Sequence, residues 1–353
     1  MNSLNRTWPL ILPYAGVTPR FGSPLAHAGT GSATLGRVTL GRNAWLGAYT
    51  VIRADGHFVT AGEDFHLGAR STLHIAHEVF PCIAGDRVTV GEHACVHACT
   101  LGSDIVVGDR TVILDGTVIG DYVIFEPGST VFPGKRIDGG FLYAGSPAKR
   151  IRRLEPGEVA KRRQEMLRAH AGATQPDPPR QIPARDSDID ASVFIASTAN
   201  LRGRVIAAKS TSIWFANDFD AGAAEISIGL RSNVQDNTVI RCSGAGVRIG
   251  RDTTVGHNVT IHDSIIGNQA LIGIGSVVAP GTVVQDRVLL AASARTEPGQ
   301  VLESGWLYAG NPAAKLAPLD HGKQALIDMI IGHYCRYAID FKTAESALLP
   351  AGS

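Results

Sequence analysis

Histidines and acidic residues recur in two similar segments of the chain, and their side chains could bind a metal or transfer protons. The first segment contains LHIAH at 73–77 and VGEHACVH at 90–97, and the second contains VGHNVTIH at 255–262. Imidazoles and carboxylates are common Zn²⁺ ligands, and histidine is also a frequent general acid or base near neutral pH. The candidate residues are His74, His77, Glu92, His93, His97, His257 and His262. Such chemistry requires a rigid framework that brings distant segments together.

That framework is indicated by large apolar residues at every sixth position. This period matches neither the three-to-four spacing of a helix nor the alternation of a strand. It is typical of a coil of short flat strands joined by tight turns, in which each strand buries one side chain on an inner ridge. The first ladder is Val107, Ile113, Ile119, Phe125 and Val131, and the second is Ile266, Ile272, Val278, Val284 and Leu290.

The two ladders belong to an internal duplication. VTVGEHACVHACTLG at 88–102 aligns with TTVGHNVTIHDSIIG at 253–267, and FLYAGSPAKRI at 141–151 aligns with WLYAGNPAAKL at 306–316. We therefore predict a mainly β chain made of two tandem β-helices, each followed by a C-terminal α-helix. The predicted helices are 155–171 and 322–343. The predicted domains are 1–171, a proline-rich linker at 172–186, and 187–353.

The bulk composition excludes several classes of protein. The net charge of +1 over 353 residues argues against a nucleic-acid partner, because nucleic-acid binding needs a clustered basic face. The five cysteines are odd in number and lack disulfide-framework spacing, which favours reduced thiols. The N-terminal segment has neither a cleavage pattern nor an apolar run long enough to span a membrane. We expect a soluble cytoplasmic protein with a small-molecule substrate and no membrane partner.

Several motifs of the first copy resemble those of the γ-class carbonic anhydrases and their hexapeptide-repeat relatives. They are Arg-x-Asp at 53–55, His74, Val-Gly at 90–91, His97, and Gly-Ser-Pro-Ala-Lys at 145–149. The resemblance covers about 34–154 and 187–319. It implies that each copy is a left-handed β-helix of hexapeptide repeats and that the chains form a homotrimer. It also implies zinc at a subunit interface, held by the first and third histidines of one subunit and the second histidine of its neighbour.

Neither copy carries the complete motif of the family. In the first copy Glu92 replaces the second histidine, and Gly68 and Ala69 replace a Gln-Asp pair. In the second copy Arg241 replaces the first histidine, and Asp220 replaces the family arginine. The matching residues of the first copy are Arg53, Asp55, His74 and His97. Those of the second copy are Asn233, Gln235, Asp236, His257 and His262.

Two pairings of the copies follow from this resemblance. If first copies pair with each other, His74, His97 and Glu92 of the next chain form a two-histidine, one-carboxylate site suited to Zn²⁺ or Fe²⁺. The second copies would then be structural or bind an anion at Arg241, whose charge repels a metal. If unlike copies pair, His257 replaces Glu92 as the third ligand, and Arg53 faces Asp236. Closed threefold symmetry favours the first pairing.

The resemblance implies a metal-dependent, carbonic anhydrase-like lyase or hydrolase with an interfacial site. Zn²⁺, with Fe²⁺ as the alternative, lowers the pKa of a bound water and delivers hydroxide to CO2 or another small electrophile. Arg53 and Asp55 would support the site, His77 would shuttle protons, and His93 and His262 are alternate ligands. The alternatives are a hexapeptide-type acyltransferase that uses an acyl-CoA and a histidine base, and a trimeric scaffold whose sites have decayed.

Overall fold

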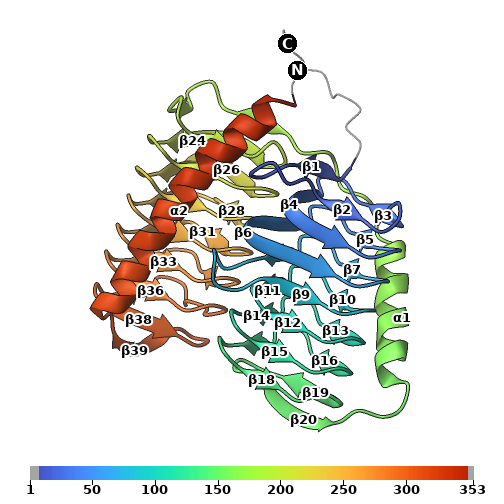
Figure 1. The fold of residues 1–353 in the computed structure, drawn as a ribbon. Coiled ribbons are helices and arrows are strands. Elements are labelled where there is room, and N and C mark those ends of the chain that lie inside the picture. The colour runs from blue at the N-terminus through green and yellow to red at the C-terminus, as the bar shows by residue number, and fades with distance from the viewer. Residues whose placement is uncertain (1–7, 349–353) are drawn as a thin grey trace. The chain divides into compact units, whose positions relative to one another are not determined.

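A computed structural model describes residues 8–348. The chain divides into two compact units, Met1–Pro178 and Pro179–Ser353, and the division falls within the segment predicted as a linker. Both units consist mainly of short parallel strands stacked in coils, with one helix after the last coil of each unit (Figure 1). Across residues 8–348, neither helix combines the length and apolar character that a bilayer-spanning segment needs.

The first unit has a 12-stranded and an 8-stranded sheet. The larger sheet contains β1 (Leu10–Leu12), β2 (Arg20–Phe21), β4 (Ala33–Leu40), β6 (Val51–Ala61), β8 (Thr72–His74), β9 (Cys82–Ala84), β11 (Cys95–His97), β12 (Thr100–Leu101), β14 (Val112–Ile113), β15 (Val118–Ile119), β17 (Thr130–Val131) and β18 (Arg136–Ile137). The smaller contains β3 (His27–Ala28), β5 (Trp45–Leu46), β7 (His66–Leu67), β10 (Thr89–Val90), β13 (Ile105–Val107), β16 (Val123–Phe125), β19 (Phe141–Ala144) and β20 (Lys149–Arg153).

The strand order shows why the six-residue period produces a solenoid. β11 lies between β8 and β14 in parallel register, so it pairs with the strands three places before and after it in the chain. One coil therefore contains three strands, and Ile113 and Val131 are register partners 18 residues apart (131 − 113). The rung residues of the first predicted ladder are at most 2 % exposed and belong to the unit's core. The predicted β-solenoid is confirmed.

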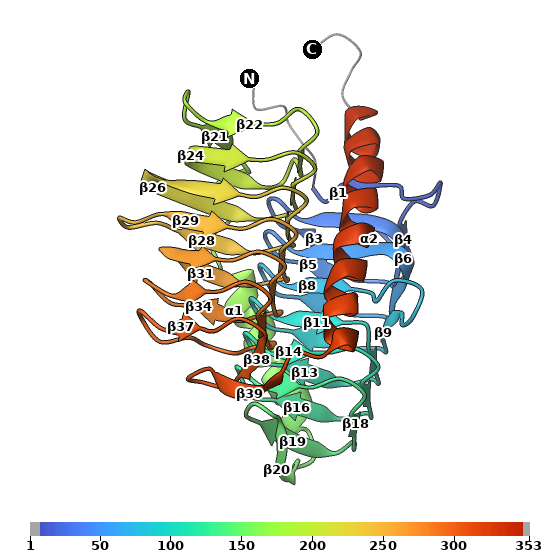
Figure 2. The ribbon, with the colours of Figure 1, turned by 90° about the vertical axis from the view of Figure 1, so that its left-hand side faces the viewer.

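The second unit repeats this architecture with an 11-stranded and an 8-stranded sheet (Figure 2). The larger contains β21 (Gln181–Pro183), β22 (Asp188–Ile189), β24 (Asn200–Ala207), β26 (Asp218–Ile228), β28 (Val239–Arg241), β29 (Val247–Ile249), β31 (Thr260–His262), β32 (Ser264–Ile266), β34 (Val277–Val278), β35 (Val283–Val284) and β37 (Val301–Leu302). The smaller contains β23 (Phe194–Ile195), β25 (Ser212–Ile213), β27 (Asn233–Val234), β30 (Thr254–Val255), β33 (Leu271–Ile272), β36 (Leu289–Leu290), β38 (Trp306–Ala309) and β39 (Ala314–Pro318).

The two helices pack on their own units in different ways. Helix α1 (Glu158–Ala171) is mostly polar and contacts the sheet through Val159 and Met166, which lie against Val106 and Ile124. Helix α2 (His321–Ser346) inserts Phe341 among aromatic side chains that include Phe194 and Trp214. Burial of large aromatic rings favours close association of a helix with a sheet. Both helices occur where the sequence predicted them.

Candidate metal centre

Three adjacent strands of the first unit align the chemically active side chains in one column. Arg53 of β6 is the register partner of His74 in β8, and His74 is the partner of His97 in β11. Register partners in parallel strands have side chains on the same face of the sheet. The coil thus brings together residues that are up to 44 positions apart (97 − 53).

The two imidazoles of this column face each other. His74 Nδ1 lies 3.1 Å from His97 Nε2, and His74 is buried whereas His97 is partly exposed. The outer nitrogen of each ring faces a carboxylate: Asp55 Oδ1 lies 3.1 Å from His74 Nε2, and Asp115 Oδ1 lies 2.5 Å from His97 Nδ1. Arg53 forms an ion pair with the second oxygen of Asp55.

This order of groups fixes where the imidazole protons reside. An ionised carboxylate only accepts hydrogen bonds, so each outer nitrogen must carry a hydrogen and donate it. In the neutral imidazoles the inner nitrogens of His74 and His97 then both present lone pairs. Two lone pairs 3.1 Å apart repel unless a proton or a cation lies between them. The first unit therefore contains a prepared position for a positive charge.

The donor set fits a divalent metal. Two nitrogens bound to Zn²⁺ at tetrahedral geometry are separated by about 3.3 Å, given Zn–N bonds of about 2.05 Å. The observed separation of the inner nitrogens is close to this value. Histidine ligands usually donate their other N–H to a carboxylate, as both rings do here. Within the described part of the first unit, no third imidazole, thiolate or carboxylate converges with them to complete a three-donor cluster.

The other candidates of the first copy lie elsewhere in the unit. His77 is in the loop after β8, with Nε2 3.9 Å from Glu78 Oε1. His93 occupies a turn with φ of 54°, where burial and the cations of Arg70 and Arg110 lower its pKa to about 4. Glu92 precedes it in the same turn, close enough to α1 to act on the pKa of His170.

In the second unit the same column lacks a pair of imidazoles. Arg241 stands at the position of His74. Its register partners are His262, at the position of His97, and Asp220, at the position of Arg53. The Arg241 guanidinium donates to the Asp218 carboxylate and, over 2.6 Å, to the Asp218 main-chain oxygen. Because this cation already has a carboxylate partner, the geometry gives no support to the predicted anion site at Arg241.

His257 of the second unit also has a carboxylate beside its ring. Asp236 Oδ2 lies 3.2 Å from His257 Nδ1, and the Tyr334 hydroxyl of α2 lies 3.5 Å from Nε2. Asp236 also accepts a hydrogen bond from the Phe215 main-chain N–H, which fixes its orientation. The carboxylate lies beside Nδ1 without a hydrogen bond of good geometry between them, and Nε2 lies within reach of the Tyr334 hydroxyl.

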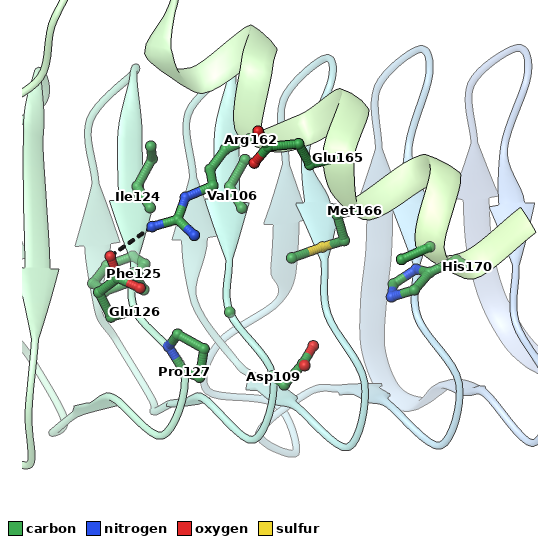
Figure 3. Close-up of a pocket in the computed structure, with 12 residues that line it drawn as sticks. Val106, Asp109, Ile124, Phe125, Glu126, Pro127, Arg162, Glu165, Met166 and His170 are labelled. Atoms are coloured by element: carbon green, nitrogen blue, oxygen red, sulfur yellow. Dashed lines mark hydrogen bonds and ion pairs between the residues drawn. The ribbon is translucent and has the colours of Figure 1, made fainter. Parts of the chain in front are cut away.

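A separate pocket of about 280 Å³ lies beside α1 in the first unit (Figure 3). Its floor is apolar, with Val106, Ile124 and Met166, and at one end Arg162 forms an ion pair with Glu126. Neither His74 nor His97 contributes to its lining. The pocket is therefore not the metal centre.

Sequence reasoning did not identify Asp115. This residue follows β14, one coil after His97 (115 − 97 = 18), so the coil places it beside that imidazole. A search for acidic residues one coil length from each histidine would have found it. Asp55, in contrast, was identified from the Arg-x-Asp motif, and the structure places it against His74.

The fold and this column of residues define a class: hexapeptide-repeat β-solenoids that place histidines on the flat side of the coil. The chain belongs to the γ-carbonic anhydrase and YrdA family within that class. It is 34 % identical over 157 residues to YrdA of Escherichia coli (strain K12), a match that covers 43 % of this chain and 85 % of YrdA.

Other comparisons agree with this assignment. The chain is 31 % identical over 133 residues to the mitochondrial γ-carbonic anhydrase 2 of Arabidopsis thaliana, covering 36 % of this chain and 48 % of that protein. The match thus spans about half the length of the plant relative. A solved structure described as an acetyltransferase, from Desulfovibrio desulfuricans G20, covers 91 % of this chain and 78 % of its own with a TM-score of 0.53. At 16 % identity this likeness concerns the fold alone. No family model matches the chain.

Proposed function

We propose that the protein is a metal-dependent enzyme of the γ-carbonic anhydrase type and that His74 and His97 supply two of the metal ligands. The observation that carries the proposal is the pair of inner nitrogens, 3.1 Å apart, whose outer partners are both carboxylates. A divalent cation bound there supplies Lewis-acid activation of water for attack on a small electrophile such as CO2. Zn²⁺ is the metal we expect, because imidazole nitrogens suit it.

The residues around the pair hold and orient it. Asp55 keeps the hydrogen of His74 on Nε2, and Arg53 forms a buried ion pair with the same carboxylate. His77 lies in the loop that follows the same strand and is the candidate for moving protons to solvent. These roles require no movement of the rigid coil.

The third donor must come from another β-helix unit, and two residues meet the requirement. Glu92 of a first unit offers a carboxylate, and His257 of a second unit offers an imidazole. We favour His257, because it offers an imidazole like the two donors of the first unit and has the Asp236 carboxylate 3.2 Å from its ring. Glu92 instead lies near His170 of α1 and acts on its pKa. Threefold symmetry alone favours pairing of first units with each other and Glu92 as the third donor, whereas the preference for His257 requires pairing of unlike units.

Metal analysis of the full-length chain after mild purification tests the proposal. We expect close to one zinc per chain in the wild type and a loss of metal in His74→Ala and His97→Ala. His262→Ala is the matched control, because His262 occupies the position of His97 in the second unit and should be dispensable. A wild-type protein that neither retains nor rebinds Zn²⁺ would instead support the acyltransferase or scaffold alternatives. Sedimentation of the same sample tests the predicted homotrimer.

A further inference from the structure

Asp115 makes a close contact with His97 on the side of the ring away from His74. Its Oδ1 lies 2.5 Å from His97 Nδ1, a short distance for a hydrogen bond between a ring nitrogen and a carboxylate. Asp115 follows β14, and its main-chain oxygen accepts a hydrogen bond from the Gly134 N–H of the next coil. The backbone that carries the carboxylate is therefore held in the coil.

The contact determines which nitrogen of His97 can bind a cation. The carboxylate accepts the hydrogen of Nδ1, so Nε2 keeps its lone pair and faces His74. Without this acceptor the ring is free to carry its hydrogen on Nε2 or to rotate about its second side-chain torsion, which is broad for histidine. Either change removes the inward-facing lone pair.

The second unit supplies an internal comparison. Residues 111–118 (TVILDGTV) align with 276–283 (SVVAPGTV), so Pro280 occupies the position of Asp115. Pro280 has no side-chain acceptor for His262, the counterpart of His97. In that unit Arg241 also replaces His74. The acceptor is thus found in the copy that has two facing imidazoles, whereas the turn itself forms with either residue.

We propose that Asp115 is a positioning residue that holds His97 in the tautomer and orientation required for metal binding. The inference rests on the proposed function, since it assigns His97 as a ligand. Asp115 differs from Asp55 in environment: the Asp115 side chain is 40 % exposed, whereas the Asp55 side chain is fully buried beside Arg53. Substitution of Asp115 therefore leaves no uncompensated buried cation and should preserve the fold.

Zn²⁺ affinity, measured by chelator competition on the full-length protein, provides the first test. Loss of a carboxylate that orients a metal-bound histidine typically lowers metal affinity by roughly 10- to 100-fold, and we expect Asp115→Ala to do so. Asp115→Asn retains an oxygen acceptor without the charge and should lose less. Asp104→Ala is the control, because Asp104 pairs with Arg87 on the surface of the same unit. Equal affinity in the wild type and Asp115→Ala would overturn the inference.

Nitrogen NMR of the histidine side chains provides a readout that does not depend on bound metal. In the metal-free wild type we expect the His97 hydrogen on Nδ1, with the signal identified by its absence in His97→Gln. In Asp115→Ala we expect a shift toward the Nε2–H form or a tautomeric mixture. An unchanged His97 tautomer would overturn the inference even if the protein binds no zinc, whereas absence of zinc from the wild type would contradict only the proposed function.

Discussion

The two units are built from the same kind of coil but place different side chains at the same column of positions. In the first unit the column reads Arg53, His74 and His97, and in the second it reads Asp220, Arg241 and His262. The inward ladders remain aliphatic or aromatic and buried in both. Because the inner ridge provides the stability, the outward column can exchange an imidazole for a guanidinium without loss of the fold.

The groups behind the column change together with it. Asp55 of the first unit aligns with Gly222, and Asp115 aligns with Pro280. The acids that orient His74 and His97 are thus absent from the second unit, which instead places Asp218 against Arg241. Under the proposed function, metal binding therefore depends on the carboxylates behind the imidazoles as well as on the imidazoles themselves.

Removal of the third donor should have the largest effect and would sharpen the comparison most. We expect His257→Ala to lose zinc and Glu92→Gln to retain it, because His257 offers an imidazole and has the Asp236 carboxylate beside its ring. Metal content per chain after gel filtration is the measurement. Retention of metal in His257→Ala together with loss in Glu92→Gln would instead show that first units pair with each other.

Much of the fold could be predicted from the sequence, because its dominant signal is local and repeated. Each buried rung residue marks one strand. Because Ile113 and Val131 are register partners 18 residues apart (131 − 113), a six-residue period places three strands in one coil. The pairing of His74 with His97 also follows, once their separation of 23 positions (97 − 74) is taken as one enlarged coil.

The remaining details of the site depend on side-chain orientation, which periodicity does not specify. The contact of Asp115 with His97 depends on which way a turn side chain points. The engagement of Arg241 by Asp218 likewise depends on a long, flexible side chain. His93 became a candidate ligand because it is a histidine in the right segment of the sequence. Only the structure shows that it lies in a left-handed turn near Arg70 and Arg110.

Removal of the acid partner of an arginine should have very different effects in the two units. Asp55→Ala removes the carboxylate that pairs with the buried Arg53 and accepts from His74, and loss of one member of a buried pair costs about 3–5 kcal/mol. Asp220→Ala breaks a half-exposed contact with Arg202, for which we expect roughly 0–1 kcal/mol. Urea unfolding of both variants measures the difference. Similar losses of unfolding free energy in the two variants would contradict the prediction that, of these two acids, only Asp55 belongs to a buried ion pair.

The last predicted effect concerns pH and the attachment of α1. His66 Nε2 lies 2.7 Å from His170 Nδ1 of the helix, and burial, followed by the charges of His170 and Arg163, lowers the pKa of His66 to about 2. The unfolded chain binds the proton at about pH 6.5, so the free energy of unfolding should fall as the pH decreases from 6.5 toward 2. A single group with this pKa shift contributes about 2 kcal/mol between pH 6.5 and 5.

The second unit provides the control for this pH dependence. Asn233 occupies the position of His66 there and donates to Thr254 Oγ1, so the same place in the coil is filled by a group that does not titrate. His66→Asn should therefore flatten the dependence of unfolding free energy on pH between 7 and 5, as measured by urea unfolding at several pH values. A slope equal to that of the wild type would show that other groups, such as His93, are responsible for the acid sensitivity. A flattened slope would locate that sensitivity at the contact between His170 of α1 and His66 of β7.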